Sequence, residues 1–242
     1  MKTTTLFSVP SLATSVEQLN DSAWPEFLLH ADVRNWSSLY STFAEFQIVL
    51  VEHERVVAAG LTVPCSWNPD LPVPRTIDEV VWGARWPLTA PRGILCALAA
   101  LVAPDSRGRR LSRQLVKCMV ELAGRHGLMG VLAPVRPTHK HKFPEQPMEA
   151  YCVRRNAAGS LYDPWLRVHD ELGGHCLGIC EAALTVRGTV AEWERWTGQT
   201  FNRNGGHVVP GALVPVVIEL EADMGSYREP NVWYFHEARG RY

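Results

Sequence analysis

The chain has 242 residues, of which 46% are hydrophobic, and a net charge of -1. This length and composition suit a globular protein with a real core. The balance of 24 Lys+Arg against 25 Asp+Glu argues against global attraction to nucleic acid or to an anionic membrane. The first residues lack the continuous apolar segment of a signal peptide, and no apolar run approaches the roughly 20 residues of a membrane span.

The six cysteines are scattered and contain no CxxC pair. Only Cys176 and Cys180 lie close together, and their spacing matches no zinc pattern. We therefore expect reduced thiols, no metal centre and a cytoplasmic location.

The first sixty-odd residues predict two short helices and a hairpin. Helices are expected over 24–29 and 36–46, the second capped by Asn35 or Ser37. Residues 48–63 hold two β-rich segments around a polar turn, which is typical of a hairpin.

An irregular insertion then precedes a buried strand. Residues 66–93 are dense in Pro, Asn and Asp, so we expect loops there, with one short element over 77–82. Residues 94–104 form a nearly uninterrupted apolar run, the pattern of a central strand covered on both faces.

A β-turn-α-β unit follows this strand. One apolar stripe predicts a helix over 111–126, with Gly127 as its C′ residue. Residues 130–137 read as the next strand, and the handedness of such units makes the two strands parallel. The stripe consists of Leu111, Leu115, Cys118, Met119 and Leu122.

The last third predicts a second insertion, two helices and two strands. Residues 138–163 form a polar, Pro-containing insertion, and Asp163 followed by proline is the signature of a helix start. Strands are expected around 177–186 and 212–220, with a short capped helix between them. We interpret residues 1–242 as a single α/β domain with two Pro-rich insertions.

The turn between the buried strand and the first long helix is a candidate anion site. Backbone N–H groups at a helix N-terminus bind anions, Gly108 permits close approach, and Arg107, Arg109 and Arg110 add positive charge. The alternative is a plain connection whose arginines face water. The turn is neither a Walker loop nor a GxGxxG dinucleotide fingerprint.

The segment LVAPDSRGRRLSRQLVKCMVELAGRHGL resembles motif A of the GNAT superfamily of N-acetyltransferases. The family pattern is R/Q-x-x-G-x-G/A. Arg107 matches its first position, whereas Arg110 stands where the family has Gly and Ser112 where it has Gly or Ala. The resemblance implies a mixed central sheet with splayed parallel strands four and five, flanked by helices.

The resemblance also implies which residues hold the donor. The amides of the turn would bind the pyrophosphate of coenzyme A, and the edge of strand four would carry its pantetheine arm. Arg110 either crowds the pyrophosphate, contacts it, or faces an acidic acyl carrier protein. The implied set is Leu101, Val102, Ala103, Arg107, Gly108, Arg109, Arg110, Leu111 and Ser112.

Two further matches suggest catalytic residues. VHDELGG aligns with the family's LYEKLGF and puts His169 in the tyrosine position, where an imidazolium would protonate the leaving thiolate. APVRPT followed by DPWLRVHDELGG is similar to GNAT-like domains of polyketide loading modules, which implies Thr138 as an oxyanion donor paired with His169. The alternatives are a surface histidine and an ordinary loop threonine. Tyr234 and His236, which alternate onto one face of a β-like run, are weaker candidates.

These features predict an acyltransferase. It would move an acyl group from a phosphopantetheine thioester, acyl-CoA or acyl carrier protein, to a small-molecule amine, in specialised metabolism. The rivals are a decarboxylase of malonyl-type thioesters and a non-catalytic thioester-binding module. Four tryptophans are candidates for an acceptor pocket or for simple packing: Trp82, Trp86, Trp165 and Trp233.

Overall fold

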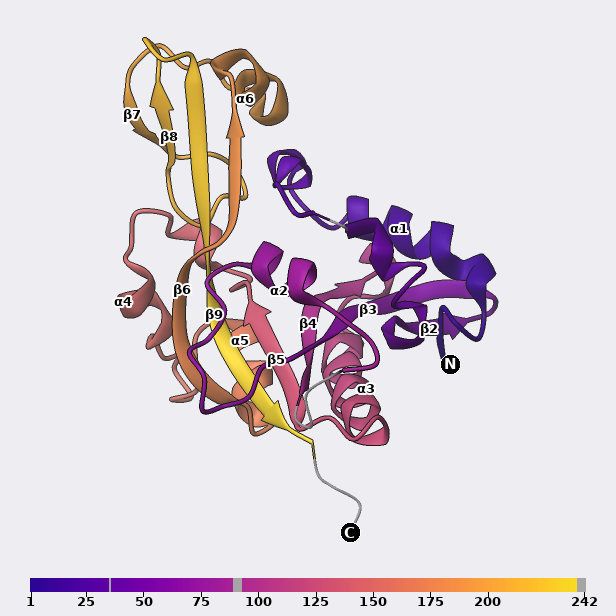
Figure 1. Ribbon diagram of the computed structural model, residues 1–242. Helices are drawn as coiled ribbons and strands as arrows, with labels where there is room; N and C mark the ends of the chain where they lie inside the picture. Colours follow the sequence, from indigo (N-terminus) through magenta and orange to yellow (C-terminus); the bar gives the residue numbers. More distant parts are fainter. Residues whose placement is uncertain (35, 89–92, 239–242) are drawn as a thin grey trace.

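A computed structural model describes residues 1–34, 36–88 and 93–238. In this part of the chain one sheet runs in the order β1-β2-β3-β4-β5-β9-β8-β7, and β6 also pairs with β9 (Figure 1). The strands are β1 Lys2–Thr5, β2 Ile48–Glu52, β3 Arg55–Cys65, β4 Ile94–Val102, β5 Gly130–Val135, β6 His175–Gly188, β7 Gly205–His207, β8 Val216–Glu219 and β9 Met224–Glu237. The helices are α1 Ala13–Asp21, α2 Ile77–Gly83, α3 Leu111–Arg125, α4 Met148–Cys152, α5 Pro164–Glu171 and α6 Val190–Thr197.

The strands β4 and β5 are parallel and diverge. Their register contains the pairs Leu95 with Val131 and Cys96 with Leu132, although β4 continues to Val102 against β3. From Ala97 onward the edge of β4 therefore lacks a strand partner on the β5 side. The predicted mixed sheet with splayed parallel strands is confirmed.

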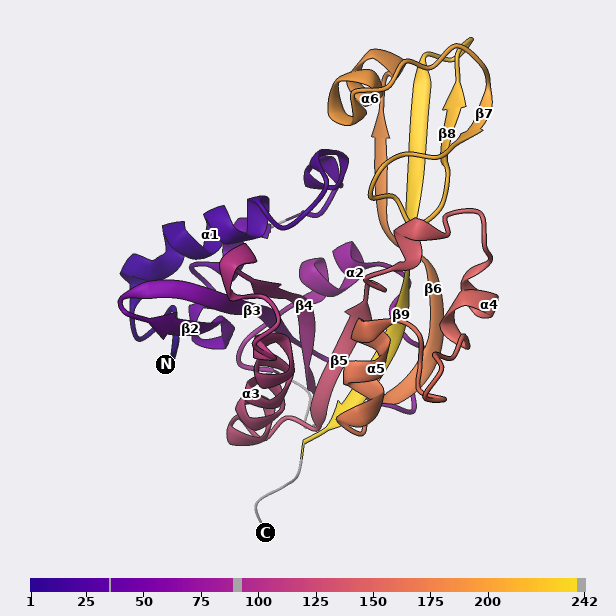
Figure 2. The ribbon, with the colours of Figure 1, turned by 180° about the vertical axis from the view of Figure 1, so that it is seen from behind.

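The helices α3 and α5 lie on the same face of this sheet, the face turned toward the reader in Figure 2. The predicted stripe of α3 is buried at Leu111, Leu115, Met119 and Leu122, because these positions recur on one side of a helix. Gly127 ends the helix with a φ of +67°, a conformation that glycine adopts without a steric cost. The predicted βαβ unit is thus confirmed.

The long strands β6 and β9 extend beyond the main sheet into a lobe at the top of Figure 1. There β8 pairs with β9, and α6 packs its tryptophans on the strands. The lobe has its own apolar cluster, which includes Phe27, Trp193, Trp196 and Tyr227. Thr189 and Glu192 form a capping box at the start of α6, so the predicted capped helix is confirmed.

The N-terminal predictions differ from the structure. The regular helix is α1, which the sequence analysis did not anticipate, and the expected helices over 24–29 and 36–46 are short 3₁₀ turns at Glu26–His30, Trp36–Leu39 and Ala44–Phe46. Single-turn segments of this kind depend on tertiary packing rather than on propensity. Asn35, one of the suggested caps, lies outside the described residues.

Near the C-terminus the observed strand β8 is shorter than the expected strand over 212–220. Its first residue is Val216, because Pro215 has no N–H to give to a ladder. The β-like run around His236 is in fact part of β9, which the sequence analysis did not count as a strand of the sheet.

Both insertions contain regular structure. The first holds α2, as predicted, and residues 89–92 of it lie outside the described part. The second holds α4 and a 3₁₀ turn at Lys140–Lys142. No helix among the described residues is long and apolar enough to span a membrane.

Candidate active site

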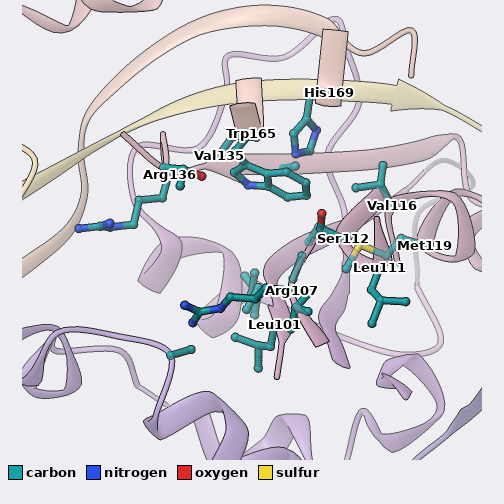
Figure 3. A pocket seen from close by; sticks show the side chains of 18 of the residues that line it. Leu101, Arg107, Leu111, Ser112, Val116, Met119, Val135, Arg136, Trp165 and His169 are labelled. Atoms are coloured by element: carbon teal, nitrogen blue, oxygen red, sulfur yellow. The ribbon is translucent and has the colours of Figure 1, made fainter. Parts of the chain in front are cut away.

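A cavity of about 390 Å³ fills the wedge between β4 and β5. We call it cavity A. The edge of β4, the start of α3 and the side chains of α5 form its walls, as Figure 3 shows. Its lining residues include Ala97–Val102, Ser106–Gly108, Arg110–Ser112, Val116, Met119, Ala133–Arg136, Thr138, Trp165 and His169.

The arginine-rich turn forms one end of cavity A. Gly108 has a φ of +78° and a Cβ on it would meet open space, so the missing side chain leaves the amides of the turn accessible. Arg110, the residue before α3, also has a positive φ, of 61°. The family's glycine at this position matches that left-handed backbone, which costs an ordinary residue about 1 kcal/mol or more.

The charge of cavity A is positive. Arg107 and Arg110 line it without a salt bridge among the described residues, Arg136 lines it as the partner of Glu229, and no described Asp or Glu belongs to its lining. The helix dipole at the start of α3 adds to this potential. The residues present therefore fit an anionic ligand, and the apolar floor along β4 fits an uncharged arm.

Two residues of the implied donor set lie elsewhere. Arg109 does not line the cavity, because its guanidinium binds both carboxylate oxygens of Glu52 at 2.9 and 3.0 Å. Ala103 is also outside the lining, and its amide donates to the carbonyl of Val57. The other seven residues of the set, Leu101, Val102, Arg107, Gly108, Arg110, Leu111 and Ser112, line cavity A.

His169 points from α5 into cavity A beside Trp165 (Figure 3). The side chain is nearly inaccessible, with 2% exposure, and its Nδ1 lies 2.8 Å from Nε2 of His236 on β9. Its Nε2 is buried and has no hydrogen-bond partner among the described residues. An orphaned buried nitrogen at a cavity wall is a group that a ligand can satisfy.

Burial keeps both imidazoles neutral. The pKa of His169 is lowered to about 3, first by burial and then by the neighbouring His236. The pKa of His236 is lowered to about 4, again mainly by burial. The resting form at neutral pH is thus the neutral imidazole, not the imidazolium that the sequence analysis expected.

Gly174 makes the contact between these two histidines possible. A Cβ on it would lie 2.7 Å from the ring of His236 and 2.9 Å from the carbonyl oxygen of His169. Any larger residue would push the strand and the helix apart. The second glycine of the LGG sequence is therefore required by packing at the site.

Asp163 joins the loop after β5 to α5. This carboxylate is 1% exposed and caps α5 by accepting from the amide of Trp165 at 2.9 Å. It also accepts from the amides of Thr138 and His139 and from the hydroxyl of Tyr151. The predicted cap is confirmed, and it fixes the loop of Thr138 relative to the helix of His169. Thr138 itself is exposed at the rim of cavity A.

A buried ion pair closes the other side of the site. Arg136 donates from Nε to Glu229 at 2.5 Å and from Nη2 to the carbonyl of Gly211 at 2.6 Å. The second oxygen of Glu229 accepts from the hydroxyl of Tyr227 at 2.5 Å. Because Glu229 is 1% exposed, this network ties the end of β5 to the upper lobe.

A second cavity, of about 480 Å³, adjoins the first. We call it cavity B. The residues Trp24, Leu98, Pro134 and Arg136 line both cavities, so the two meet in the wedge between the strands. Cavity B is further lined by Glu17, Asn20, Asp21, Leu28, Leu29, Ala31, Val33, Trp36, Tyr40, Ile77, Leu184, Glu229 and Asn231.

The tryptophans singled out from the sequence have different positions. Trp165 lines cavity A, whereas Trp233 is fully buried. Trp82 and Trp86 line neither cavity. Trp24 lines both, and the sequence analysis did not identify it.

Arg136 was not among the site residues predicted from the sequence. Its partner Glu229 is 93 residues away, so no local spacing announces the pair. A signal was nevertheless present, since Arg136 is a lone charge that directly follows the apolar strand β5. Within the described residues no cluster of His, Cys, Asp and Glu suits a metal ion.

Comparisons with known proteins agree with this geometry. The chain is 30% identical over 247 residues to arginine N-acetyltransferase avaD of Aspergillus versicolor, covering 89% of this chain and 85% of that protein. No protein-family profile matches the chain. The chain belongs to the GNAT family of N-acyltransferases and is an enzyme of that class.

Two solved structures share the fold. The loading GNATL domain of CurA from Lyngbya majuscula superimposes with a TM-score of 0.64 at 17% identity, covering 94% of both chains. A GphF GNAT-like decarboxylase in complex with isobutyryl-CoA gives a TM-score of 0.64 at 16% identity, covering 99% of this chain and all of that one. The expected resemblance to loading-module domains is thereby confirmed at the level of fold.

Proposed function

We propose that the protein transfers an acyl group from acyl-CoA, bound in cavity A, to the amine of a small molecule bound in cavity B. Arginine is the first acceptor to test, since the relative from Aspergillus versicolor is an arginine N-acetyltransferase. The observation that carries the proposal is the buried Nε2 of His169 in the wall of cavity A, which has no hydrogen-bond partner among residues 1–34, 36–88 and 93–238.

The donor is held by the positive end of cavity A. The amides that open α3, together with Arg107 and Arg110, bind its phosphates. The uncharged arm lies along Leu101 and Val102, where β4 has no strand partner on the β5 side. In Figure 3 the guanidinium of Arg107 lies toward one end of the cavity and His169 toward the other, so the cavity spans the distance between phosphate and thioester.

An acceptor that arrives as an ammonium first gives its extra proton to water, and His169 moves the proton that then passes from the free amine to the sulfur. The amine nitrogen forms a bond to the thioester carbon, the carbon–sulfur bond breaks, the nitrogen loses a proton and the sulfur gains one. A neutral imidazole that donates from Nδ1–H to His236 presents a lone pair on Nε2. Once the nitrogen has bonded to the carbonyl carbon it is cationic and acidic, and the lone pair on Nε2 then relays its proton to the departing sulfur. This role replaces the resting acid expected from the sequence.

Thr138 and Ser112 provide hydroxyl groups to the donor. Thr138 lines cavity A, as do Arg107 and Arg136, and we propose that it donates to the thioester or its arm. Figure 3 shows the hydroxyl of Ser112 pointing into the cavity toward Trp165. Phosphopantetheine is common to CoA and to an acyl carrier protein, and we propose a place in specialised metabolism, where both serve as donors. The experiment below therefore compares acyl-CoA with an acylated carrier protein.

The test measures thiol release and product mass in parallel. Acetyl-CoA and an acetylated carrier protein are each offered with and without arginine. We expect CoA release that depends on the acceptor, together with a product heavier by one acetyl group. Malonyl-CoA is a separate arm, because its conversion to acetyl-CoA without an acceptor would instead establish the decarboxylase. Thiol release at the same rate with and without arginine, for every donor, would contradict the proposal.

A further inference from the structure

The face of α1 that lines cavity B carries two carboxylates. Glu17 and Asp21 are four residues apart and therefore lie on one side of the helix, and both line the cavity. Within the described residues neither takes part in a salt bridge. The only bond to Asp21 there is a long one, 3.4 Å, from the amide of Asn20. Two solvent-exposed carboxylates thus lie at the cavity without a counter-ion among the described residues.

On β9, the lining of cavity B includes an unsatisfied acceptor, Oδ1 of Asn231. Asn231 is 3% exposed, and its amide nitrogen donates to the carbonyl of Pro134 at 3.2 Å. Its Oδ1 is buried and has no hydrogen-bond partner in the part of the chain that the structure describes. Pro134 lines both cavities, so this oxygen lies near their junction. A ligand N–H is the group that satisfies it, because an unpaired buried acceptor is costly.

The charges of the two cavities are opposite. Cavity B is lined by the acids Glu17, Asp21 and Glu229 and by one base, Arg136, and three minus one leaves a net of two negative charges. Glu229 and Arg136 neutralise each other at 2.5 Å. The excess negative charge is therefore that of Glu17 and Asp21, which attracts cations into cavity B as the arginines attract anions into cavity A.

We propose that cavity B selects amines that carry a second, distal cationic group. The reacting amine donates to Oδ1 of Asn231 near the junction of the cavities, and Glu17 and Asp21 hold the distal guanidinium or ammonium. This inference rests on the proposed function, and it names the residues that recognise the acceptor and the chemical class they accept.

Matched acceptors test it. L-citrulline has the length of L-arginine but a neutral ureido group, and butylamine lacks the second ammonium of 1,4-diaminobutane. We expect kcat/KM to favour the dicationic member of each pair by about tenfold or more, the scale of a charge-assisted hydrogen bond. Equal use of arginine and citrulline, with diaminobutane and butylamine also equal, would overturn the inference while leaving acyl transfer intact. Failure of every amine would contradict the proposed function itself.

Variants locate the selectivity. Glu17→Gln/Asp21→Asn is expected to lower kcat/KM for arginine about tenfold and to change that for citrulline less than about twofold. The control Glu26→Gln/Glu121→Gln removes two exposed charges that line neither cavity and should leave both values unchanged. If Glu17→Gln/Asp21→Asn lowers kcat/KM for arginine and for citrulline by the same factor, Glu17 and Asp21 do not bind the distal cation.

A third variant separates the two ends of the acceptor. Asn231→Ala is expected to lower kcat/KM for arginine and citrulline by the same factor, because the amine common to both loses its partner. Calorimetric titration of arginine and citrulline into the enzyme with CoA present gives a readout without turnover. Binding of arginine that is unchanged in Glu17→Gln/Asp21→Asn would overturn the assignment whatever the behaviour of Asn231→Ala.

Discussion

At neutral pH the imidazole of His169 carries no charge, because burial beside Trp165 and His236 disfavours the imidazolium. A neutral imidazole acts through whichever nitrogen faces the substrate. Here the 2.8 Å contact with His236 engages Nδ1 and leaves Nε2 for the cavity. The chemistry of the residue therefore depends on a partner on another strand, which fixes the orientation of the ring.

Replacing either histidine should lower turnover without weakening donor binding. We expect His169→Gln to reduce kcat by about 100-fold or more, the usual worth of a positioned proton carrier, with little change in KM for acyl-CoA. His236→Phe removes the partner and keeps the bulk of the ring, so a smaller reduction of about tenfold is expected for lost orientation. Steady-state kinetics with both substrates varied would check this.

Further measurements distinguish a proton-transfer role of His169 from a purely structural one. Nitrogen-15 NMR of the wild-type imidazoles should show His169 as the Nδ1–H tautomer, and His236→Phe should shift that equilibrium. Wild-type kcat in His169→Gln would remove the residue from the mechanism. A raised KM with unchanged kcat would assign it to donor binding.

At the scale of the element, the turn before α3 combines strain and charge at Arg110. Its left-handed backbone is a conformation that glycine adopts freely, and its side chain lines cavity A. Arg110→Gly should therefore stabilise the fold by about 1 kcal/mol and raise KM for acyl-CoA several-fold. Urea denaturation and donor kinetics measure the two effects. A fall in stability would mean that contacts of the side chain outweigh the backbone strain, and an unchanged or lower KM would show that the side chain does not hold the donor.

Arg136, which directly follows β5, and Glu229 on β9 form an ion pair, and removing only one of the two should strongly destabilise the fold. Arg136→Met leaves the buried carboxylate of Glu229 unpaired, and such losses cost about 3–5 kcal/mol. The double variant Arg136→Met/Glu229→Gln removes both charges and should recover much of that stability. A double-mutant cycle from denaturation midpoints checks this, and additive losses in the cycle would show that the two charges are not coupled.

The elements that the sequence predicted are those encoded locally. The helix α3 has an uninterrupted stripe ending at Gly127, and Asp163 followed by proline marks the start of α5. The strand β9 was missed as part of the sheet because its pairing partners are distant, and sequence spacing does not contain that information. The candidate site was predicted only in part for the same reason. His169 was identified from a local segment, whereas its contact with His236 joins residues 67 positions apart in the sequence.

On the scale of the whole molecule, the splayed strands place two cavities of opposite charge end to end. Cavity A is lined by arginines and cavity B by an excess of carboxylates, and they share the wall around Trp24 and Pro134. Under the proposed function, an anionic donor would be attracted to cavity A and a cationic acceptor to cavity B. The two buried histidines lie in the layer between α5 and β9, so folding itself depends on their protonation.

Stability should accordingly fall in mild acid. The folded pKa values of His169 and His236 are lowered to about 3 and about 4, whereas an unfolded histidine has a pKa near 6.5. Between those values the unfolded chain binds more protons, so stability is complete above about pH 6.5 and decreases as the pH falls toward 4. We expect the folded state to be roughly 2–3 kcal/mol less stable at pH 5.5 than at pH 7.5.

Urea midpoints at both pH values measure this loss, and the comparison with His169→Gln/His236→Gln isolates its source. The double variant keeps every other titrating group, so contributions common to both proteins cancel. Its stability should change far less between pH 7.5 and pH 5.5, because no buried imidazole remains to be protonated on unfolding. An equal acid loss in both proteins would mean that the two imidazoles accept protons in the folded state. They would then carry charge in the layer between α5 and β9, and the lone pair on Nε2 of His169 would no longer be available in mild acid.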